Sequence, residues 1–460
     1  MQQTFAIIVL TWKAAFRYRL FWVIAALLLA AVIGLPLLIK DDGTAAGFAQ
    51  ILITYTLGAV TGLLGFCTLW LACGTLARDV EECQMQMVAV KPIGRWQIWL
   101  GKWLGIVTLN AALLAVAGIS IYGLLEWRAR RLPAAELFKL QNEVLVARGS
   151  AKEENVDAFV EKMADQQLKA RMEKHQLGDA DPNVVRAQME QQLKMELQAV
   201  APGGTRWWRI QLGAAKDHLK DQPLFLRTKF HTALTTQPDT VYASWQVGTP
   251  KKTAIWQDDM SLAPDTFHEF QVPPNLFDDK GDLIIGFRNV NDTVLVFSLD
   301  EGMEVLYRQG GFGINLVRGL GIILCWMALL AALGLAAASL LSFPVAAFFS
   351  LALLAISLSS GTLSTVVSDG TIMGFNEEKG TKGHSALDNV AVPVFRGMLE
   401  VVNLVQQFSP IDSLTTGRSI TWEQLGQAFG QIVLLLGGVL GLIGIFIFQR
   451  RELATAQGTQ

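Results

Sequence analysis

The chain has 460 residues, of which 52% are hydrophobic and only 17% are charged, and its mean hydropathy is +0.36. Soluble domains carry about 25% charged residues, so this composition excludes an ordinary soluble protein and predicts membrane embedding with a soluble part attached. The net charge of −2 gives no argument for a nucleic-acid partner. All four cysteines lie in or beside apolar segments, so no disulfide is expected in the large polar insertion described below.

The first segments predict an interfacial helix and three spans. Residues 3–18 place apolar side chains on one helical face, which indicates a helix lying flat at the membrane surface, or alternatively the first turns of a longer helix. Residues 20–39 carry no charge and are long enough for ~30 Å of hydrocarbon. This run is too long for a cleavable signal peptide, and no Ala-x-Ala site closes it. Further spans are expected over about 50–77 and over 103–125.

A short polar segment, 78–103, separates the second and third spans. Apolar residues recur in it at helical spacing, which predicts a short amphipathic helix over 79–90 at a membrane surface. Pro92 cannot continue that helix, and Gly94 suits the turn that follows. On these residues alone, a solvated loop between two spans is an equal alternative. The apolar residues are Val80, Cys83, Met87 and Val90.

The order of these features resembles the first cytoplasmic loop of ABC-2 type ABC-transporter permeases. An acidic helix follows the second span, Lys-Pro-Ile-Gly-Arg follows at 91–95, and Gly-Lys at 101–102 opens the third span. In that family this loop is a coupling helix that docks into a cleft of a separate ATPase subunit. The contacts that the resemblance implies are Arg78, Asp79, Glu81, Glu82, Lys91, Pro92, Arg95 and Lys102.

The remaining spans set the topology. Between Arg318 and Asp369 there is no charge, so two spans fit, reversing at residues 342–344. A sixth span is expected over 424–449. Six spans put both termini on one side, and the Lys and Arg residues there place that side in the cytoplasm. Three arginines within 128–131 count against this, but long loops translocate largely regardless of charge.

The insertion, 127–312, is therefore expected outside the cytoplasm. Its first part, 127–204, predicts a helical hairpin broken at 178–182, and its second part, 205–312, predicts a β-sandwich of about seven or eight strands. The facing apolar stripes of the hairpin are Val156, Phe159, Val160 and Met163, and Val185, Met189, Leu193 and Leu197. The predicted strands include 224–230, 241–247, 266–272, 282–288, 293–299 and 302–307.

Four tryptophans of the predicted sandwich are candidates for an aromatic platform that binds sugars or lipid headgroups. The more usual position of such side chains is the core, and both alternatives stay open. The four are Trp207, Trp208, Trp245 and Trp256.

A second external segment, 367–423, contains an amphipathic helix over 394–408 that suits the outer interface. The ABC-2 family commonly has a half-buried hairpin here, and the closing Phe-Ile-Phe-Gln-Arg-Arg-Glu-Leu also resembles its usual end. The resemblance covers roughly 1–126 and 313–455. The large insertion is closer to the subgroup of multi-copper enzyme maturation or gliding-type permeases.

The chain lacks the motifs of several other functions. No Gly-rich loop ends in Gly-Lys-Ser/Thr, so ATP and Mg²⁺ are expected on a partner subunit and no cofactor on this chain. The five histidines show no ligand spacing, and neither a Gly-x-Ser-x-Gly elbow nor a His-Glu-x-x-His motif occurs. The spans carry no carboxylate, which disfavours a proton- or sodium-driven carrier.

We therefore expect a polytopic α-helical membrane protein with six transmembrane helices and a large extracytoplasmic α+β insertion between helices three and four. Its parts are 1–126, 127–204, 205–312 and 313–460. The resemblance implies a bacterial cytoplasmic membrane, a second permease copy as partner, surrounding lipids, and export driven by a P-loop ATPase subunit, with no enzymatic activity in this chain. The competing hypothesis is a membrane anchor that displays the sandwich to bind a glycan or protein, or transmits force, without transport.

Overall fold

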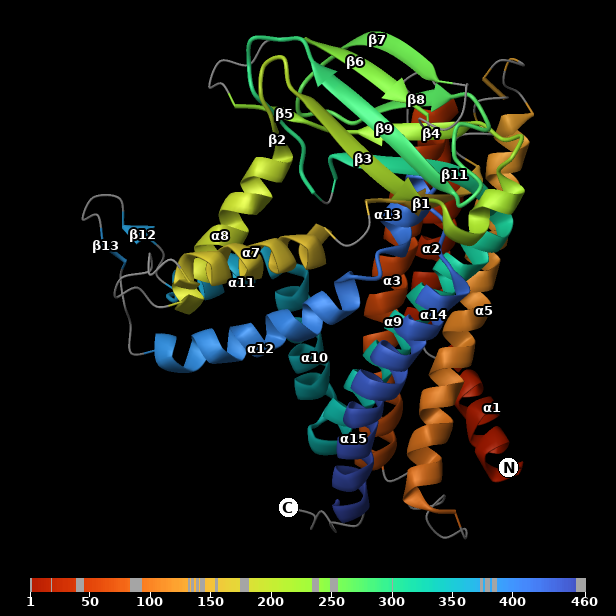
Figure 1. Ribbon diagram of the computed structural model, residues 1–460. Helices are drawn as coiled ribbons and strands as arrows, with labels where there is room; N and C mark the ends of the chain where they lie inside the picture. The colour runs from red at the N-terminus through yellow and green to blue at the C-terminus, as the bar shows by residue number, and fades with distance from the viewer. Residues whose placement is uncertain are drawn as a thin grey trace. The chain divides into compact units, whose positions relative to one another are not determined.

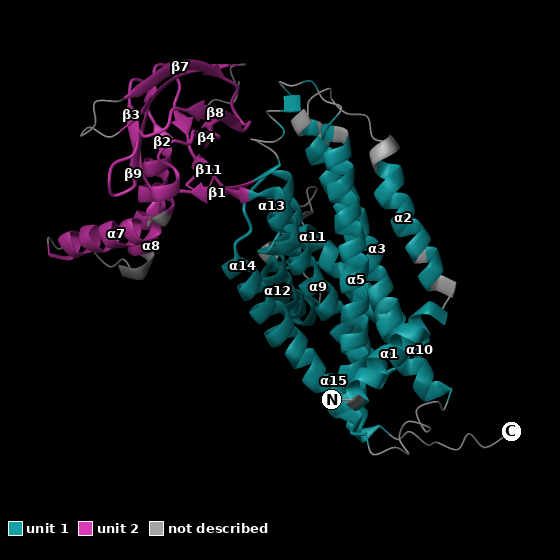
Figure 2. Cartoon of the chain, turned by 90° about the vertical axis from the view of Figure 1, so that its right-hand side faces the viewer, with its two compact units in different colours: residues 1–146, 311–460 teal, residues 147–310 magenta. Residues whose placement is uncertain are grey.

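The structure is a computed structural model, and it divides the chain into two compact units, residues 1–146 with 311–460 and residues 147–310 (Figure 2). It describes residues 2–17, 19–38, 45–82, 93–130, 133, 136–137, 140, 145–153, 156–173, 182–233, 240–248, 255–299, 301–372, 375–376, 381–382 and 387–451.

The first unit is helical, and its long helices run side by side as a bundle (Figure 1). α9 is central, because α3, α5, α10 and α15 all pack against it. The described helices of this unit are α1 (Gln2–Arg17), α2 (Arg19–Leu38), α3 (Ala45–Glu81), α5 (Arg95–Ala129), α9 (Phe312–Leu340), α10 (Phe343–Leu358), α11 (Ser360–Asp369), α12 (Asp388–Gln406), α13 (Pro410–Thr415), α14 (Trp422–Ala428), the π-helical η3 (Phe429–Gly437) and α15 (Gly438–Arg450). Two short strands, β12 (Phe375–Asn376) and β13 (Thr381–Lys382), pair with each other.

Within the described ranges, four helices are long and apolar enough to cross a membrane, or up to six if each of two bent pairs forms one span. The bent pairs are α1 with α2, at 76°, and α10 with α11, at 71°. α14, η3 and α15 together make one of the four, Trp422–Arg450. These helices are those of a membrane-embedded protein. The six spans and the sidedness predicted from the sequence remain predictions.

Small residues let the helices of the bundle approach closely. A Cβ atom on Gly334 of α9 would lie 2.7 Å from the Ala72 Cβ of α3, and one on Gly105 of α5 would lie 2.8 Å from the Thr11 Cβ of α1. The Trp12 indole N–H then donates to the Gly105 carbonyl at 3.1 Å. One face of α1 therefore packs on α5. The prediction of a flat interfacial helix over 3–18 did not include this contact with another helix.

The second unit combines a helical pair with a β-sandwich. α7 (Val156–Glu173) and α8 (Pro182–Gln198) pack on each other, with Pro182 opening α8 as its sequence position suggests. One predicted member of the hairpin stripe, Phe159, is exposed. The strands are β1 (Val146–Ala151), β2 (Ala199–Val200), β3 (Thr205–Gln211), β4 (Leu224–Thr228), β5 (His231–Thr232), β6 (Val241–Val247), β7 (Trp256–Leu262), β8 (His268–Val272), β9 (Asp282–Asn289), β10 (Leu295–Val296) and β11 (Met303–Gly311), with the 3₁₀ helix η2 (Gly213–His218) between β3 and β4.

Two four-stranded sheets, ordered β1-β11-β4-β8 and β3-β9-β6-β7, enclose one hydrophobic core. A small third sheet is ordered β2-β10-β5. The strands alternate inward and outward side chains, as β6 shows with Val241, Ala243, Trp245 and Val247 buried. The buried residues of this sandwich core all come from the second unit.

Several boundaries differ from those predicted. The division at 204/205 is corrected, because β1 precedes the helical pair and joins a sandwich sheet, so hairpin and sandwich form one unit. β7 was missed because its exposed edge carries Gln257, Asp258 and Asp259 in place of an alternating pattern. The amphipathic helix predicted over 394–408 is α12, which begins at Asp388, and Pro393 lies inside it.

Candidate functional site

The predicted coupling segment joins α3 to α5 at one end of the helical unit. α3 continues without a break through Arg78 and Asp79 to Glu81, so the predicted helix 79–90 is corrected at its start: residues 79–81 are the last turn of the span helix. Gly94 precedes α5, and its backbone N–H donates to the Gln97 side chain at 3.1 Å. Residues 83–92, with the predicted contacts Lys91 and Pro92, lie outside the described residues.

Lys102 is buried and ion-paired. Its Nζ donates to Asp79 Oδ2 at 2.6 Å and to the Thr75 carbonyl at 2.7 Å, which joins α5 to the end of α3. Lys102 is only 7% exposed, because it lies one turn after Ile98, where α5 enters the apolar interior of the bundle. The implied role of Lys102 as an ATPase contact is corrected: its ammonium lies inside the helical unit.

Glu81 and Arg78 contact the beginning of α10. The Glu81 carboxylate accepts the backbone N–H of Phe343 at 2.8 Å, and this N–H is one that the helix itself leaves without a partner. A negative charge at this position also interacts favourably with the helix dipole. The Arg78 guanidinium lies 4.2 Å from the centre of the Phe343 ring. The reversal between α9 and α10 is thereby tied to the end of α3.

Two arginines complete this end of the unit at the C-termini of two helices. Arg95 donates to the carbonyls of Phe448, Gln449 and Arg451 at 3.3, 2.7 and 2.9 Å, which closes the end of α15. Arg451 donates in turn to the Ala338 and Ser339 carbonyls at 2.9 and 3.1 Å, near the end of α9. Cations suit helix C-termini because orphan carbonyls and the dipole both favour positive charge there.

We call these side chains, Arg78, Asp79, Glu81, Arg95, Lys102 and Arg451, the end network. Sequence reasoning missed Arg451, although a basic pair directly after an apolar span is a helix C-terminus signal. Glu82, the last described residue before the gap, is exposed. The network joins the described ends of α3 and α5 to the start of α10 and to the ends of α15 and α9.

An apolar groove lies between α5 and α9, farther along the same bundle. Its volume is about 500 Å³. Small residues line much of it, and Ile119 and Val317 on its rim are exposed. The lining residues include Ala111, Ala115, Gly118, Tyr122, Gly313 and Gly321.

The four tryptophans of the predicted platform do not lie together on a surface. Trp208 and Trp245 are buried in the sandwich core, and Trp256 stacks on Phe270 at 5.9 Å between ring centres. Only Trp207 is well exposed, at 52%. The four-residue platform is therefore corrected: side chains on successive strand positions, such as 207 and 208, point to opposite faces of the sheet.

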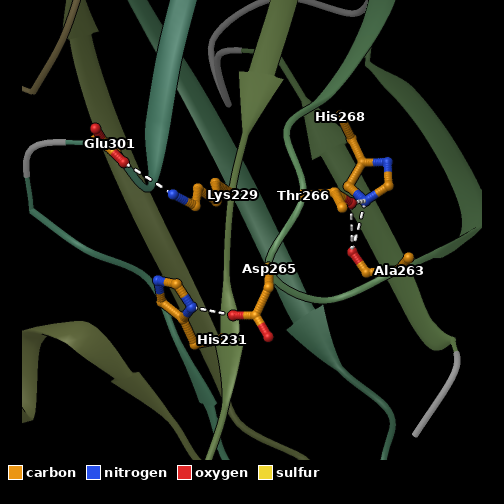
Figure 3. A network of polar contacts seen from close by, with 7 residues as sticks. All are labelled: Lys229, His231, Ala263, Asp265, Thr266, His268 and Glu301. Atoms are coloured by element: carbon orange, nitrogen blue, oxygen red, sulfur yellow. Dashed lines mark hydrogen bonds and ion pairs between the residues drawn. The ribbon is translucent and has the colours of Figure 1, made fainter. Parts of the chain in front are cut away.

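A polar network beside β4 and β8 is a second candidate, and Figure 3 shows its geometry. His231 pairs with Asp265, and Lys229 pairs with Glu301 at 3.1 Å. His268 Nε2 lies 2.7 Å from the Ala263 carbonyl and 2.9 Å from Thr266 Oγ1. Because that nitrogen must carry a proton to bond the carbonyl, it is not a base for the threonine. The contacts fix the turn between β7 and β8, where Asp265 has a positive φ of 63°.

The second unit also contains a partly buried ion pair, Arg206 with Glu153, at 3.7 Å. Burial raises the pKa of Glu153, and the nearby Arg206 charge offsets part of that shift. Burial likewise lowers the pKa of Arg206, which lies 4.7 Å from the Trp208 ring centre. This pair therefore makes the stability of the unit depend on pH.

Over the ranges that the structure describes, no three His, Cys, Asp or Glu residues gather as metal ligands. Neither a protein-family model nor a curated protein matches this chain. The resemblance to ABC-2 permeases stays a prediction from the sequence.

Proposed function

We propose that this chain is the membrane subunit of an ABC-2 type ABC transporter, acting as an exporter and driven by a separate ATPase subunit. The observation that carries the proposal is the end network. It links the ends of α3 and α5, which flank the predicted coupling segment, to the ends of three other helices through Glu81, Arg95 and Arg451. A partner that moves this segment would move those helices with it.

In this proposal ATP and Mg²⁺ bind the partner, and the contact surface of this chain is the exposed end of α3 with residues 83–92. Glu82 is the described acidic side chain that we assign to the partner contact. Glu81 is also exposed but bonds to the start of α10, and Asp79 is paired with the buried Lys102. The bundle then converts closure of the ATPase into a change between inward-open and outward-open states.

A second permease copy is part of the proposal. The groove between α5 and α9 supports it, because grooves lined by Gly and Ala allow helices to approach closely in a membrane, where van der Waals packing drives association. Membrane lipids surround the rest of the bundle, and the membrane is a bacterial cytoplasmic one with both termini in the cytoplasm. The insertion then lies on the outer side.

Copurification from native membranes tests the proposal. The tagged intact chain is expected to retain a P-loop ATPase, and Glu82→Lys is expected to reduce that retention while Glu400→Lys, an exposed acid on α12, leaves it unchanged. The absence of any ATPase with the wild-type chain, after mild crosslinking of the membranes, refutes the proposal.

The competing function is a membrane anchor that presents the second unit to a glycan or protein, or transmits force to it. The independent core of residues 147–310 favours this candidate. It predicts that no ATPase is retained and that activity survives when the unit is held by a different anchor.

A further inference from the structure

The outer face of the sheet β3-β9-β6-β7 carries a set of side chains that neither the core nor the end network uses. Its inner face supplies Trp208, Trp245 and Phe287 to the core. On the outer face, strand register places Trp207, Gly286, Gln246 and Gln257 in one row across all four strands.

Trp207 is held against the sheet by the glycine beside it. A Cβ atom on Gly286 would collide with the six-membered ring of Trp207, so that ring lies directly over the glycine backbone. The residue is 52% exposed to solvent. In the part of the chain that is described, the indole N–H makes no hydrogen bond. An aromatic face is thus presented in a fixed orientation without a core function.

The two amides in the same row are available for hydrogen bonding. Neither Gln246 nor Gln257 has a side-chain hydrogen bond within the described residues. Each amide offers two donor hydrogens and an acceptor oxygen, which matches hydroxyl groups that both donate and accept.

The charges on this face balance. Arg209 pairs with Asp282, and the next row contains Arg288 and Asp259. Among the described residues of these four strands, the face therefore carries equal numbers of positive and negative groups. Such a face favours an uncharged ligand over an anionic polymer such as a nucleic acid, which requires a basic surface.

A second aromatic, Tyr242, extends the face. It is 66% exposed and lies four residues from Gln246 along β6, a separation of about 14 Å. Trp207 lies two strands away from β6, or about 10 Å across the sheet. A ligand that contacts both aromatic rings must therefore be an extended chain and not a single small molecule.

We propose that this face binds a linear, uncharged glycan. A pyranose ring has an apolar C–H face and a rim of hydroxyls. Trp207 stacks on the C–H face of one sugar, Gln246 and Gln257 bond to its hydroxyls, and Tyr242 contacts a sugar farther along the chain. This site is independent of the proposed transport function, since it needs neither an ATPase nor a particular side of the membrane.

Calorimetric titration of the full chain in lipid nanodiscs, which contain no sugar-based detergent, tests the proposal. The probes are hexasaccharides of β1,4-glucose, α1,4-glucose, β1,3-glucose and β1,4-N-acetylglucosamine. At least one is expected to bind, and Trp207→Ala should weaken that binding about tenfold or more.

Gly286→Ala is the sharper variant, because it keeps every ligand-contacting side chain but displaces the Trp207 ring; it should weaken binding as well. Phe267→Ala, an exposed aromatic away from this sheet, is the control and should bind like the wild type. If Trp207→Ala misfolds, the binding measured for Gln246→Ala tests the same site, and it should also be weaker than that of the wild type. The proposal is overturned if none of the four hexasaccharides binds, or if the Trp207, Gly286 and Gln246 variants bind as tightly as the wild type.

Discussion

The ion pair between Lys102 and Asp79 should respond unequally to removal of its two partners. The Lys102 side chain is 9% exposed and that of Asp79 is 31% exposed. After Asp79→Asn, the ammonium keeps the Thr75 carbonyl but loses its counter-charge inside the bundle. After Lys102→Met, a chain of similar length fills the space, and the Asp79 carboxylate still reaches solvent.

Breaking a buried pair typically costs about 3–5 kcal/mol, and the partial exposure of Asp79 reduces this to about 2–3 kcal/mol for Asp79→Asn. Lys102→Met should cost at most about 1 kcal/mol, because a hydrophobic isostere replaces the charge. The double variant should be about as stable as Lys102→Met alone, which makes the two changes strongly non-additive.

Thermal unfolding of the intact chain in detergent, followed by size-exclusion fluorescence, measures the order of stability. We expect the melting temperature to be highest for the wild type, lower and about equal for Lys102→Met and the double variant, and lowest for Asp79→Asn. Equal melting temperatures for the two single variants, or additive effects in the double variant, would refute the view that the unpaired, buried Lys102 ammonium causes the loss of stability in Asp79→Asn.

Three further predictions follow from the packing, the end network and the second unit. Gly334→Ala should destabilise the bundle by about 1–3 kcal/mol, because its Cβ meets Ala72 and the Leu69 carbonyl, whereas Gly361→Ala, with open space around it, should not lower the melting temperature. Arg95→Ala should cost about 2 kcal/mol and speed hydrogen exchange in the last turn of α15, while exchange in α7 stays constant. For Glu153, the raised pKa means that the folded state holds its proton more tightly, so stability is greatest below the ordinary Glu range and falls as pH rises through the folded pKa. Glu153→Gln should therefore flatten the fall in melting temperature above pH ~4.3, and an unchanged slope would contradict the burial assignment.

The sequence predicts apolar helices and the β-rich insertion well, because hydropathy and period-two alternation are local signals. The reversal at residues 342–344 and the opening of α8 at Pro182 follow from proline and turn chemistry alone. The positions of charged side chains at helix ends are harder to predict from the sequence. Lys102 and Glu81 have the residue types of exposed contacts, and only the fold shows that one is buried and the other meets α10.

The tryptophans illustrate the same limit. Residues 207 and 208 are adjacent in sequence, and their separation into a solvent face and a core face depends on which side of the sheet is covered. β1 is likewise invisible locally, because its partner β11 lies more than 150 residues later in the chain. Pairings of this kind are properties of the folded topology.

The most direct test of the proposed coupling role is the accessibility of position 82 in the membrane. With Cys83→Ser, a Glu82→Cys chain is exposed to a membrane-impermeant maleimide in intact cells and in inverted vesicles. We predict labelling only in inverted vesicles, and protection there when the ATPase partner is bound. Labelling from the outside of intact cells would contradict the account, since no ATP-driven partner could reach the end of α3.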